Sequence, residues 1–271
     1  MAPMSCKSLI SVSMCCDHNV ANYSLFLILL LLMMLSLSLL LSMSSIVQCI
    51  HSLLSACLSH RIAGQNIAGT VPDVLAKFDF LQPIRLASNA FSGTIPEVYG
   101  HMRDLIDIEL HRNRLTGTIP QTMFTETTFS TNSLQNLNLG GNMLTGTLST
   151  EVGRLTDLKG LHLFKNLFTG TFPTEVGQLR DLVYLQNYGN AFSGKLPSEL
   201  AQLDRFRNLW FHDNGFTGVI PTSLSRLTLL GECTGRVEHP SLLSFSLLPS
   251  FLPSFVRPLI RVLLRLVVGD E

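Results

Sequence analysis

The chain has 271 residues, with 19 basic and 19 acidic residues and a formal net charge of zero, so bulk electrostatics do not favour nucleic acid or an anionic membrane as a partner. Charged residues make up only 14% of the chain, compared with about 25% in ordinary soluble domains. Two segments, residues 18–60 and 240–256, lack Asp, Glu, Lys and Arg altogether. We therefore expect a soluble middle region flanked by two apolar ends.

The first apolar segment follows an N-terminal segment, residues 1–23. It covers residues 24–43, reads SLFLILLLLMMLSLSLLLSM and predicts an N-terminal hydrophobic helix. Twenty helical residues span about 30 Å, the thickness of a bilayer's hydrocarbon core. Its length, and a preceding segment with only Lys7 against Asp17, favour a signal anchor over a cleaved signal peptide, and both interpretations stay open. Lys7 places the N-terminus in the cytoplasm, so we expect the rest of the chain outside the cell, membrane-anchored or secreted.

Residues 44–60 are predicted to form an N-terminal cap helix. Their apolar residues recur at helical spacing: Ile46, Ile50, Leu53, Leu54 and Cys57. Cys49 and Cys57 are close enough in sequence to form a disulfide in an oxidising compartment. Cys-x-x-Cys spacing, which would suggest zinc or redox chemistry, does not occur in the sequence.

Residues 61–230 contain an internal repeat. A glycine recurs every 24 residues, apart from one step of 29, at Gly69, Gly93, Gly117, Gly146, Gly170, Gly194 and Gly218. Four residues before most of these glycines stands an asparagine: Asn89, Asn113, Asn142, Asn166, Asn190 and Asn214. Two residues after each asparagine stands a large apolar residue: Phe91, Leu115, Leu144, Phe168, Phe192 and Phe216. This period predicts a solenoid of about seven turns, in which each turn is buried against its neighbours. We number the turns one to seven by these glycines, so that Gly69 belongs to turn one and Gly218 to turn seven.

Two of the turns read LIDIELHRNRLTGTIP, at residues 105–120, and LKGLHLFKNLFTGTFP, at residues 158–173. They resemble the plant-type leucine-rich repeat, L-x-x-L-x-L-x-x-N-x-L-[ST]-G-x-I-P, which receptor-like kinase ectodomains and polygalacturonase-inhibiting proteins carry. The resemblance implies an α/β fold: a right-handed solenoid with a parallel β-sheet on its concave face and short 3-10, helical or irregular segments on its convex face. No kinase motif occurs in the sequence, so the resemblance covers only the outer domain of such receptors.

Each repeated residue has a physical role. The x-L-x-L-x stretch predicts a short strand with its leucines inward. The asparagine is expected to pair with backbone groups where the strand ends, and the large apolar residues are expected to stack as a buried spine. The glycine permits a tight turn. The proline that stands three residues after most of the glycines is expected to prevent a helix from starting there.

The sequence departs from the repeat in three places. Five extra residues fall between Pro120 and Leu134, where we expect them on the convex side. Asn187 occupies the position of the second strand leucine in turn six. An eighth turn begins at Thr222 and is expected to fail after Leu230, without a recognisable cap.

The C-terminal tail, residues 231–271, is hydrophobic and of low complexity. Four prolines interrupt it from Pro240 onward, which argues against a membrane-spanning helix. Arg257, Arg261 and Arg265 would share one helical face, so a cationic amphipathic helix lying on a membrane is one interpretation. A segment without a packed role is the other, and we favour it.

The candidate binding site is the concave face, which the residues six, four, two and one before each asparagine are expected to share. The predicted ligand-binding residues are His162, Phe164, Tyr184, Gln186, Tyr188, Trp210 and His212. Neighbouring strands lie about 4.8 Å apart, so Phe164, Tyr188 and His212 should form one row, beside a second row of His162, Gln186 and Trp210. Clustered aromatic residues are typical interface anchors, although Tyr and Trp also brace neighbouring strands.

We find no indication of a catalyst in the sequence. Asp107 and Glu109 would lie about 7 Å apart on one strand, but alternating charges on an open, solvated face are ordinary. His162 and His212 are two strands apart, too far to share a zinc ion without further ligands. No phosphate-binding loop or nucleophile elbow occurs. We therefore predict no enzyme activity, no metal and no cofactor.

The main hypothesis is a non-catalytic recognition module that binds a protein, peptide or glycan on the concave face. It would have a receptor-like, defence or signalling role, a co-receptor as a partner, and residues 24–43 as its contact with the membrane. A second hypothesis is a secreted inhibitor of a cell-wall-degrading enzyme. A third is a structural fragment of a longer repeat protein.

Overall fold

The computed structural model describes residues 62–77, 81–125, 134–230 and 232–234. The N-terminal segment 1–23, the hydrophobic helix expected at 24–43 and the cap helix expected at 44–60 lie outside these ranges, as does the tail apart from residues 232–234. Among the helices within the described ranges, none has the length and hydrophobicity needed to cross a bilayer.

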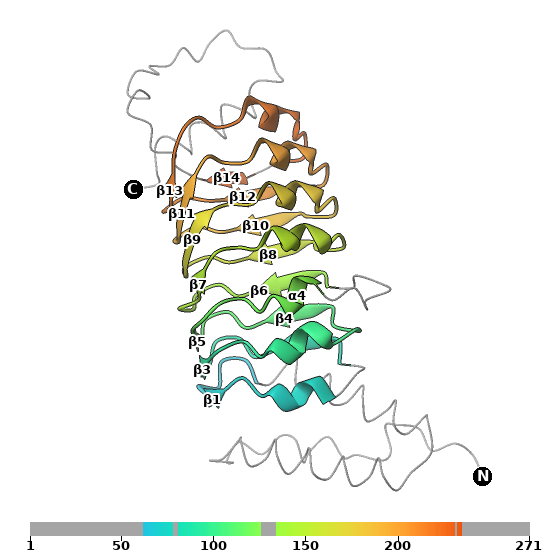
Figure 1. Ribbon diagram of the computed structural model, residues 1–271, viewed down its shortest axis with the longest axis vertical. Coiled ribbons are helices and arrows are strands. Elements are labelled where there is room, and N and C mark those ends of the chain that lie inside the picture. Colours follow the sequence, from blue (N-terminus) through green and yellow to red (C-terminus); the bar gives the residue numbers. More distant parts are fainter. Residues whose placement is uncertain (1–61, 78–80, 126–133, 231, 235–271) are drawn as a thin grey trace, which may run out of the picture. The chain divides into compact units, whose positions relative to one another are not determined.

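The described residues form a solenoid whose turns each contribute one strand to a seven-stranded parallel sheet (Figure 1). The strands are β2 (Pro83–Arg85), β4 (Asp107–Glu109), β6 (Asn136–Asn138), β8 (Gly160–His162), β10 (Tyr184–Gln186), β12 (Asn208–Trp210) and β14 (Glu232–Thr234). Neighbouring strands are in register, so that Leu161 pairs with Leu185 and Leu185 with Leu209. From β2 to β12 the central residue is at most 1% exposed, because every second side chain of a strand points to the same side. The predicted parallel sheet is confirmed, and we call its outward side the concave face.

A second row of short strands follows the asparagines, and we had not expected it. It consists of β1 (Ala68–Thr70), β3 (Ala90–Gly93), β5 (Arg114–Leu115), β7 (Thr145–Gly146), β9 (Leu167–Thr171), β11 (Ala191–Gly194) and β13 (Gly215–Phe216), paired as β1-β3-β5 and β7-β9-β11-β13. Hydrogen bonds from Met143 N to Leu115 O (2.8 Å) and from Thr145 N to Gly117 O (2.7 Å) connect the two groups. Each strand is too short to show an alternating hydrophobic pattern in the sequence.

Short helices line the opposite, convex side, as the resemblance implied (Figure 1). They are the 3-10 helices η2 (Asp73–Lys77), η3 (Glu97–His101), η4 (Thr150–Arg154), η5 (Thr174–Gln178), η6 (Ser198–Gln202) and η7 (Thr222–Arg226), and the α-helical turn α4 (Thr122–Thr125). The repeated proline does not prevent a helix: Pro96, Pro173, Pro197 and Pro221 are the N-cap residues of η3, η5, η6 and η7. That expectation was wrong because an N-cap residue precedes the helix, where proline's fixed φ and missing N–H cost little.

The solenoid accommodates the 29-residue turn without a break in the sheet. Ile108 of β4 pairs with Leu137 of β6, in the same register as strands that are 24 residues apart. Between these strands, α4 packs beside η3 and η4 in the row of convex helices. The extra residues therefore fall between α4 and β6, within the interval from Pro120 to Leu134 that the sequence indicated.

The repeated asparagines link successive turns. Asn166 is 6% exposed; its Oδ1 accepts a hydrogen bond from Leu144 N (3.0 Å), and its Nδ2 donates to Leu139 O and Leu163 O (3.0 Å each). The same three kinds of bond recur at the other members of this asparagine ladder, which are Asn89, Asn113, Asn142, Asn190 and Asn214. The predicted pairing of asparagine with strand-end backbone groups is confirmed.

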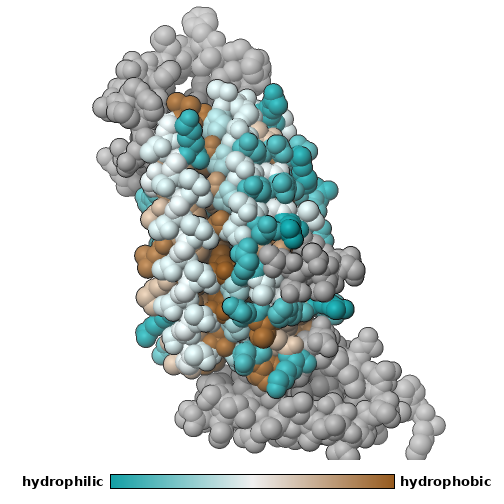
Figure 2. All heavy atoms as spheres, viewed as in Figure 1, coloured by the Kyte–Doolittle hydropathy of each residue, from teal (hydrophilic) through white to brown (hydrophobic). Residues whose placement is uncertain are grey.

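The large apolar residues after the asparagines form the predicted spine. Phe168 stacks on Phe192 with ring centroids 6.0 Å apart, and Phe192 stacks on Phe216 at 6.3 Å. All three side chains are fully buried. Figure 2 shows the surface of the solenoid from the same side as Figure 1. On this side hydrophobic residues appear mainly in a narrow stripe along the solenoid, and hydrophilic residues lie over the convex helices.

The eighth turn does not fail at Leu230. Strand β14 pairs with β12 in register, which places Cys233 opposite Leu209. The prediction that turn eight fails after Leu230 was therefore wrong. Cysteine stands at the central strand position that other turns fill with leucine or isoleucine, and the repeat pattern does not resume after it, so the sequence did not indicate a strand.

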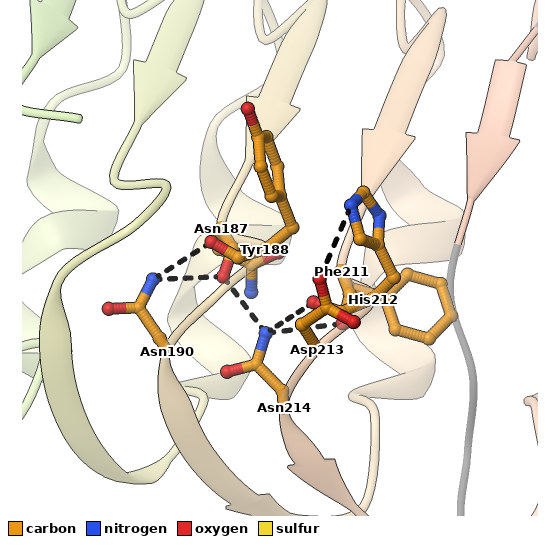
Figure 3. A network of polar contacts seen from close by, with 7 residues as sticks. All are labelled: Asn187, Tyr188, Asn190, Phe211, His212, Asp213 and Asn214. Atoms are coloured by element: carbon orange, nitrogen blue, oxygen red, sulfur yellow. Dashed lines mark hydrogen bonds and ion pairs between the residues drawn. The ribbon is translucent and has the colours of Figure 1, made fainter. Parts of the chain in front are cut away.

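Asn187 occupies a core position, as expected from its place in the repeat, and is 1% exposed. Its Oδ1 has no hydrogen-bond partner within the described ranges. Its backbone carbonyl accepts hydrogen bonds from Nδ2 of Asn190 and of Asn214, 3.0 Å each (Figure 3). The turn thus keeps the backbone geometry of its neighbours, although the Asn187 side chain places an unpaired polar atom in the core.

Candidate functional site

The register of the sheet brings the predicted site residues together. His162 pairs with Gln186, and Gln186 pairs with Trp210, so these three side chains form one row across β8, β10 and β12. Tyr184 lies two residues before Gln186 on the same side of β10. The predicted row of His162, Gln186 and Trp210 is confirmed as an arrangement in space.

The second predicted row is a continuous stack of rings. Phe164 stacks on Tyr188 with centroids 5.2 Å apart and planes 6° from parallel, and Tyr188 stacks on His212 at 4.5 Å and 15°. We call Phe164, Tyr188 and His212 the ring ladder. Figure 3 shows Tyr188 and His212 pointing to the same side, opposite to the side chains of Asn190 and Asn214.

A glycine that we had not singled out positions the ring ladder. A Cβ atom on Gly140, the corresponding residue of turn four, would lie 2.3 Å from Cε1 of Phe164. The Phe164 ring therefore lies in the space that a side chain at this position would fill. The sequence could have indicated this, because Gly140 stands at the concave-face position of turn four that Phe164 occupies in turn five.

The two rows contact each other and make one surface. The ring of His162 lies 6.4 Å from that of Tyr184, at 25°, and Nδ1 of His162 is 2.9 Å from Oε1 of Gln186. The rings of Tyr188 and Trp210 are 6.1 Å apart and tilted by 59°. All seven predicted site residues thus belong to one patch, which we call the aromatic surface.

Burial suppresses ionisation on this surface. It lowers the pKa of His162, against a smaller opposite effect of the Gln186 hydrogen bond. Burial also lowers the pKa of His111, helped by the positive charge of Arg112, and raises the pKa of Tyr188. These side chains therefore favour their neutral forms at neutral pH and act as hydrogen-bonding or stacking groups.

Two acidic residues of the face, Asp107 and Glu109, are already paired. Arg85 contacts Asp107 (Nη2 to Oδ2, 2.6 Å) and lies 3.4 Å from Oε1 of Glu109. Asn136 Nδ2 donates to the other oxygen of Asp107, at 2.8 Å. In the part of the chain that the structure describes, no group of three or more His, Cys, Asp or Glu residues is arranged to hold a metal ion. Asp107 is thus part of a local network between turns two and four.

One further column borders the ring ladder, and its members were not among the predicted site residues. They are the residues before each asparagine or its counterpart, all with positive φ: Gly64, Ser88, Arg112, Gly141, Lys165, Gly189 and Asp213. A Cβ on Gly141 would lie 3.4 Å from Cγ of Arg112, and one on Gly189 would lie 3.2 Å from Cγ of Lys165. Arg112 and Lys165 therefore each extend over the glycine of the next turn. The sequence could have indicated this column, because a long basic residue alternates with glycine at this position from turn three to turn six.

Comparison with known proteins identifies the repeat. The Leucine Rich Repeat family model matches residues 133–155. No curated protein matches the chain at a significant level. Among solved structures, the LRR ectodomain of the plant membrane receptor kinase GASSHO1/SCHENGEN3 from Arabidopsis thaliana, in complex with CASPARIAN STRIP INTEGRITY FACTOR 2, is 30% identical with a TM-score of 0.58 and covers 63% of this chain and 20% of that one.

Two further structures show the same similarity. The plant peptide hormone receptor RGFR1 in complex with RGF2 is 29% identical, with a TM-score of 0.57, and covers 63% of this chain and 28% of that one. The LRR ectodomain of the Arabidopsis receptor kinase HAESA, in complex with an N-terminal extended IDA peptide hormone ligand, is 28% identical, with a TM-score of 0.53, and covers 65% and 33%. The chain thus spans between a fifth and a third of the length of these three ectodomains. The described solenoid is a leucine-rich-repeat domain of the plant type, similar to the ectodomains of plant receptor kinases.

Proposed function

We propose that the chain is a non-catalytic recognition module that binds a peptide segment, free or within a protein, along its concave face. The observation that carries this proposal is the ring ladder, which three successive turns build on the outward side of the sheet. The fold does not require rings there, because turns two and four have Ala87 and Gly140 at the same position. Aromatic side chains that the core does not need are typical anchors of protein interfaces.

The stacking of the rings favours a peptide over a glycan. Tyr188 has a near-parallel ring on each of its two faces, at 5.2 and 4.5 Å. A sugar that stacks on an aromatic residue needs a free ring face, and Tyr188 offers its ring edge and its hydroxyl instead. Ring edges carry positive partial charge and the hydroxyl can donate or accept, which suits the carbonyls and polar side chains of a peptide.

The similar solved structures support the same class of ligand. RGFR1 is a peptide hormone receptor in complex with RGF2, and HAESA is in complex with a peptide hormone ligand. By extension, we propose a receptor-like role outside the cell, in which a co-receptor supplies the signal and residues 24–43 tether the chain to the membrane. A glycosylation-acceptor site inserted in a solenoid loop tests this topology: modification during synthesis into microsomes is expected, and an unmodified, protease-accessible solenoid contradicts it.

Selection from a random-peptide library on the full chain tests ligand binding. We expect enriched peptides whose affinity falls at least tenfold when Tyr188→Ala and Trp210→Ala are combined. Gly140→Ala should also weaken binding, because the added Cβ displaces Phe164 from its position under Tyr188. Leu167→Ala is the matched control, since Leu167 is 56% exposed but lies on β9, outside the concave face.

Peptides that bind the wild-type chain and the double variant equally would place recognition on another surface. If binding is unchanged and only the free energy of unfolding falls, the aromatic residues brace the strands. If both quantities are unchanged, neither interpretation of the aromatic surface survives.

A further inference from the structure

We infer that the peptide ligand carries acidic groups, which bind Arg112 and Lys165 beside the ring ladder. This inference rests on the proposed function, because it specifies the charge of the ligand that the same face binds. It arises from the column of residues with positive φ, which neither the aromatic surface nor the asparagine ladder explains.

Arg112 and Lys165 occupy backbone positions that disfavour them. Their φ angles are 55° and 50°, in the left-handed region where a Cβ atom crowds the following carbonyl and where glycine is strongly preferred. Turns four and six have glycine at this position, Gly141 and Gly189. Turns two and seven have Ser88 and Asp213 there, also with positive φ. The backbone therefore does not demand a long basic side chain at this position, and the two that occur are available for binding.

The two basic side chains share one direction. Each extends over the glycine of the next turn, with Cγ 3.4 Å and 3.2 Å from the Cβ positions of Gly141 and Gly189. Arg112 and Lys165 are two turns apart, which corresponds to about 10 Å across a parallel sheet. An extended peptide that crosses the strands reaches both with acidic side chains a few residues apart.

Within the described part of the chain, no carboxylate neutralises the positive charges of Arg112 and Lys165. Neither residue forms an ion pair with any residue in the described ranges, and both are exposed. Two of the nearby carboxylates, Asp107 and Glu109, are paired with Arg85. The carboxylate of Asp213 is exposed, and its Oδ2 lies 3.9 Å from Nε2 of His212. The electrostatic effect of Arg112 reaches both His111 and Tyr188. A positive strip beside positively polarised ring edges complements an anionic ligand.

The site can be tested without disrupting the fold, because glycine already occurs at the equivalent positions. Peptides are selected from a random library on the full wild-type chain and on the Arg112→Gly/Lys165→Gly variant, and the Asp and Glu content of the enriched peptides is counted. The affinity of the most enriched acidic peptide is then measured by fluorescence anisotropy. The matched control is Arg114→Gln/Lys195→Gln, which removes two positive charges from outside the concave face and leaves this strip intact.

We expect the wild-type chain and the control variant to select acidic peptides, and the glycine variant to bind them at least tenfold more weakly with an unchanged or higher melting temperature. Selected peptides that depend on Tyr188 and Trp210 but are not acidic would overturn this inference and leave the proposed function standing. Failure to select any peptide would overturn both. De-esterified oligogalacturonate that binds Arg112 and Lys165 in place of any peptide would also overturn the inference, since the anionic partner would then be a glycan.

Discussion

Two stacks of rings run across the turns of this solenoid, one in the core and one on the concave face. In the core, Phe168, Phe192 and Phe216 follow one another at 6.0 and 6.3 Å and are fully buried. On the face, the ring ladder has spacings of 5.2 and 4.5 Å and is in contact with solvent. Stacking geometry alone therefore does not distinguish a structural stack from a functional one.

The sequence variation among the turns does distinguish them. The core position is large and apolar in every turn from Phe91 to Phe216, because a small or polar residue there would leave a cavity or an unpaired group. The position on the face changes from His111 to Gly140 before the ring ladder begins. Residues that repeat in every turn maintain the fold, and residues that appear in only a few turns are candidates for function.

The largest effect should come from the core stack. Phe192→Ala removes a ring that contacts Phe168, Phe172 and Phe216, so we expect unfolding to become easier by about 3–5 kcal/mol. Tyr188→Ala, the matched change on the face, should cost about 1–2 kcal/mol, since it loses ring contacts but leaves no cavity. Urea denaturation followed by circular dichroism measures both. Equal losses would show that the ring ladder is as structural as the spine.

Asn166→Leu should come next in size. It leaves Leu144 N without its acceptor, whereas Leu139 O and Leu163 O keep the hydrogen bonds that they accept from Asn142 and Asn190. One buried unpaired group costs about 1–3 kcal/mol. We expect a loss of about 2 kcal/mol in the same denaturation experiment. A much smaller loss would mean that water or a local backbone shift satisfies Leu144 N, and that the asparagine ladder is not required for the stacking of turns.

Asn187→Leu should have the opposite sign. The change restores the repeat's leucine at a position that is 1% exposed and removes an unpaired Oδ1 from the core. We expect a gain in the free energy of unfolding of about 1–2 kcal/mol. Since the backbone carbonyl of Asn187 still accepts from Asn190 and Asn214, the ladder is unaffected. Destabilisation would show that a polar side chain is needed at this point of turn six.

The smallest effect should be the response to pH. Burial lowers the pKa of His162 below its ordinary value of 6.5, so the unfolded chain binds a proton more readily than the folded one. Stability is therefore retained above pH 6.5 and falls as the pH drops toward the folded-state pKa. His162→Gln should reduce the loss of unfolding free energy between pH 7.5 and pH 5.5. An identical loss in the variant would mean that His162 is equally solvated in both states.

The sequence by itself determined the seven repeating turns and the residues that face the core. It could do so because the same burial requirement recurs every 24 residues, as the asparagines and the spine from Phe91 to Phe216 show. It also predicted the rows of the aromatic surface, because in-register stacking of strands follows from the repeat. It did not reveal the second row of strands or β14, since elements of two to five residues carry too little pattern of their own.

Only the tertiary structure decided how the outward side chains use the space around them. Phe164 turns back over Gly140, whereas Lys165, its neighbour in sequence, extends forward over Gly189. The direction in which such a side chain points depends on which neighbouring turn has a glycine beside it and on the φ of the residue itself. Neither can be read from the sequence of a single turn. The contacts of the core follow from a local pattern, while those of the concave face follow from pairs of turns brought together by folding.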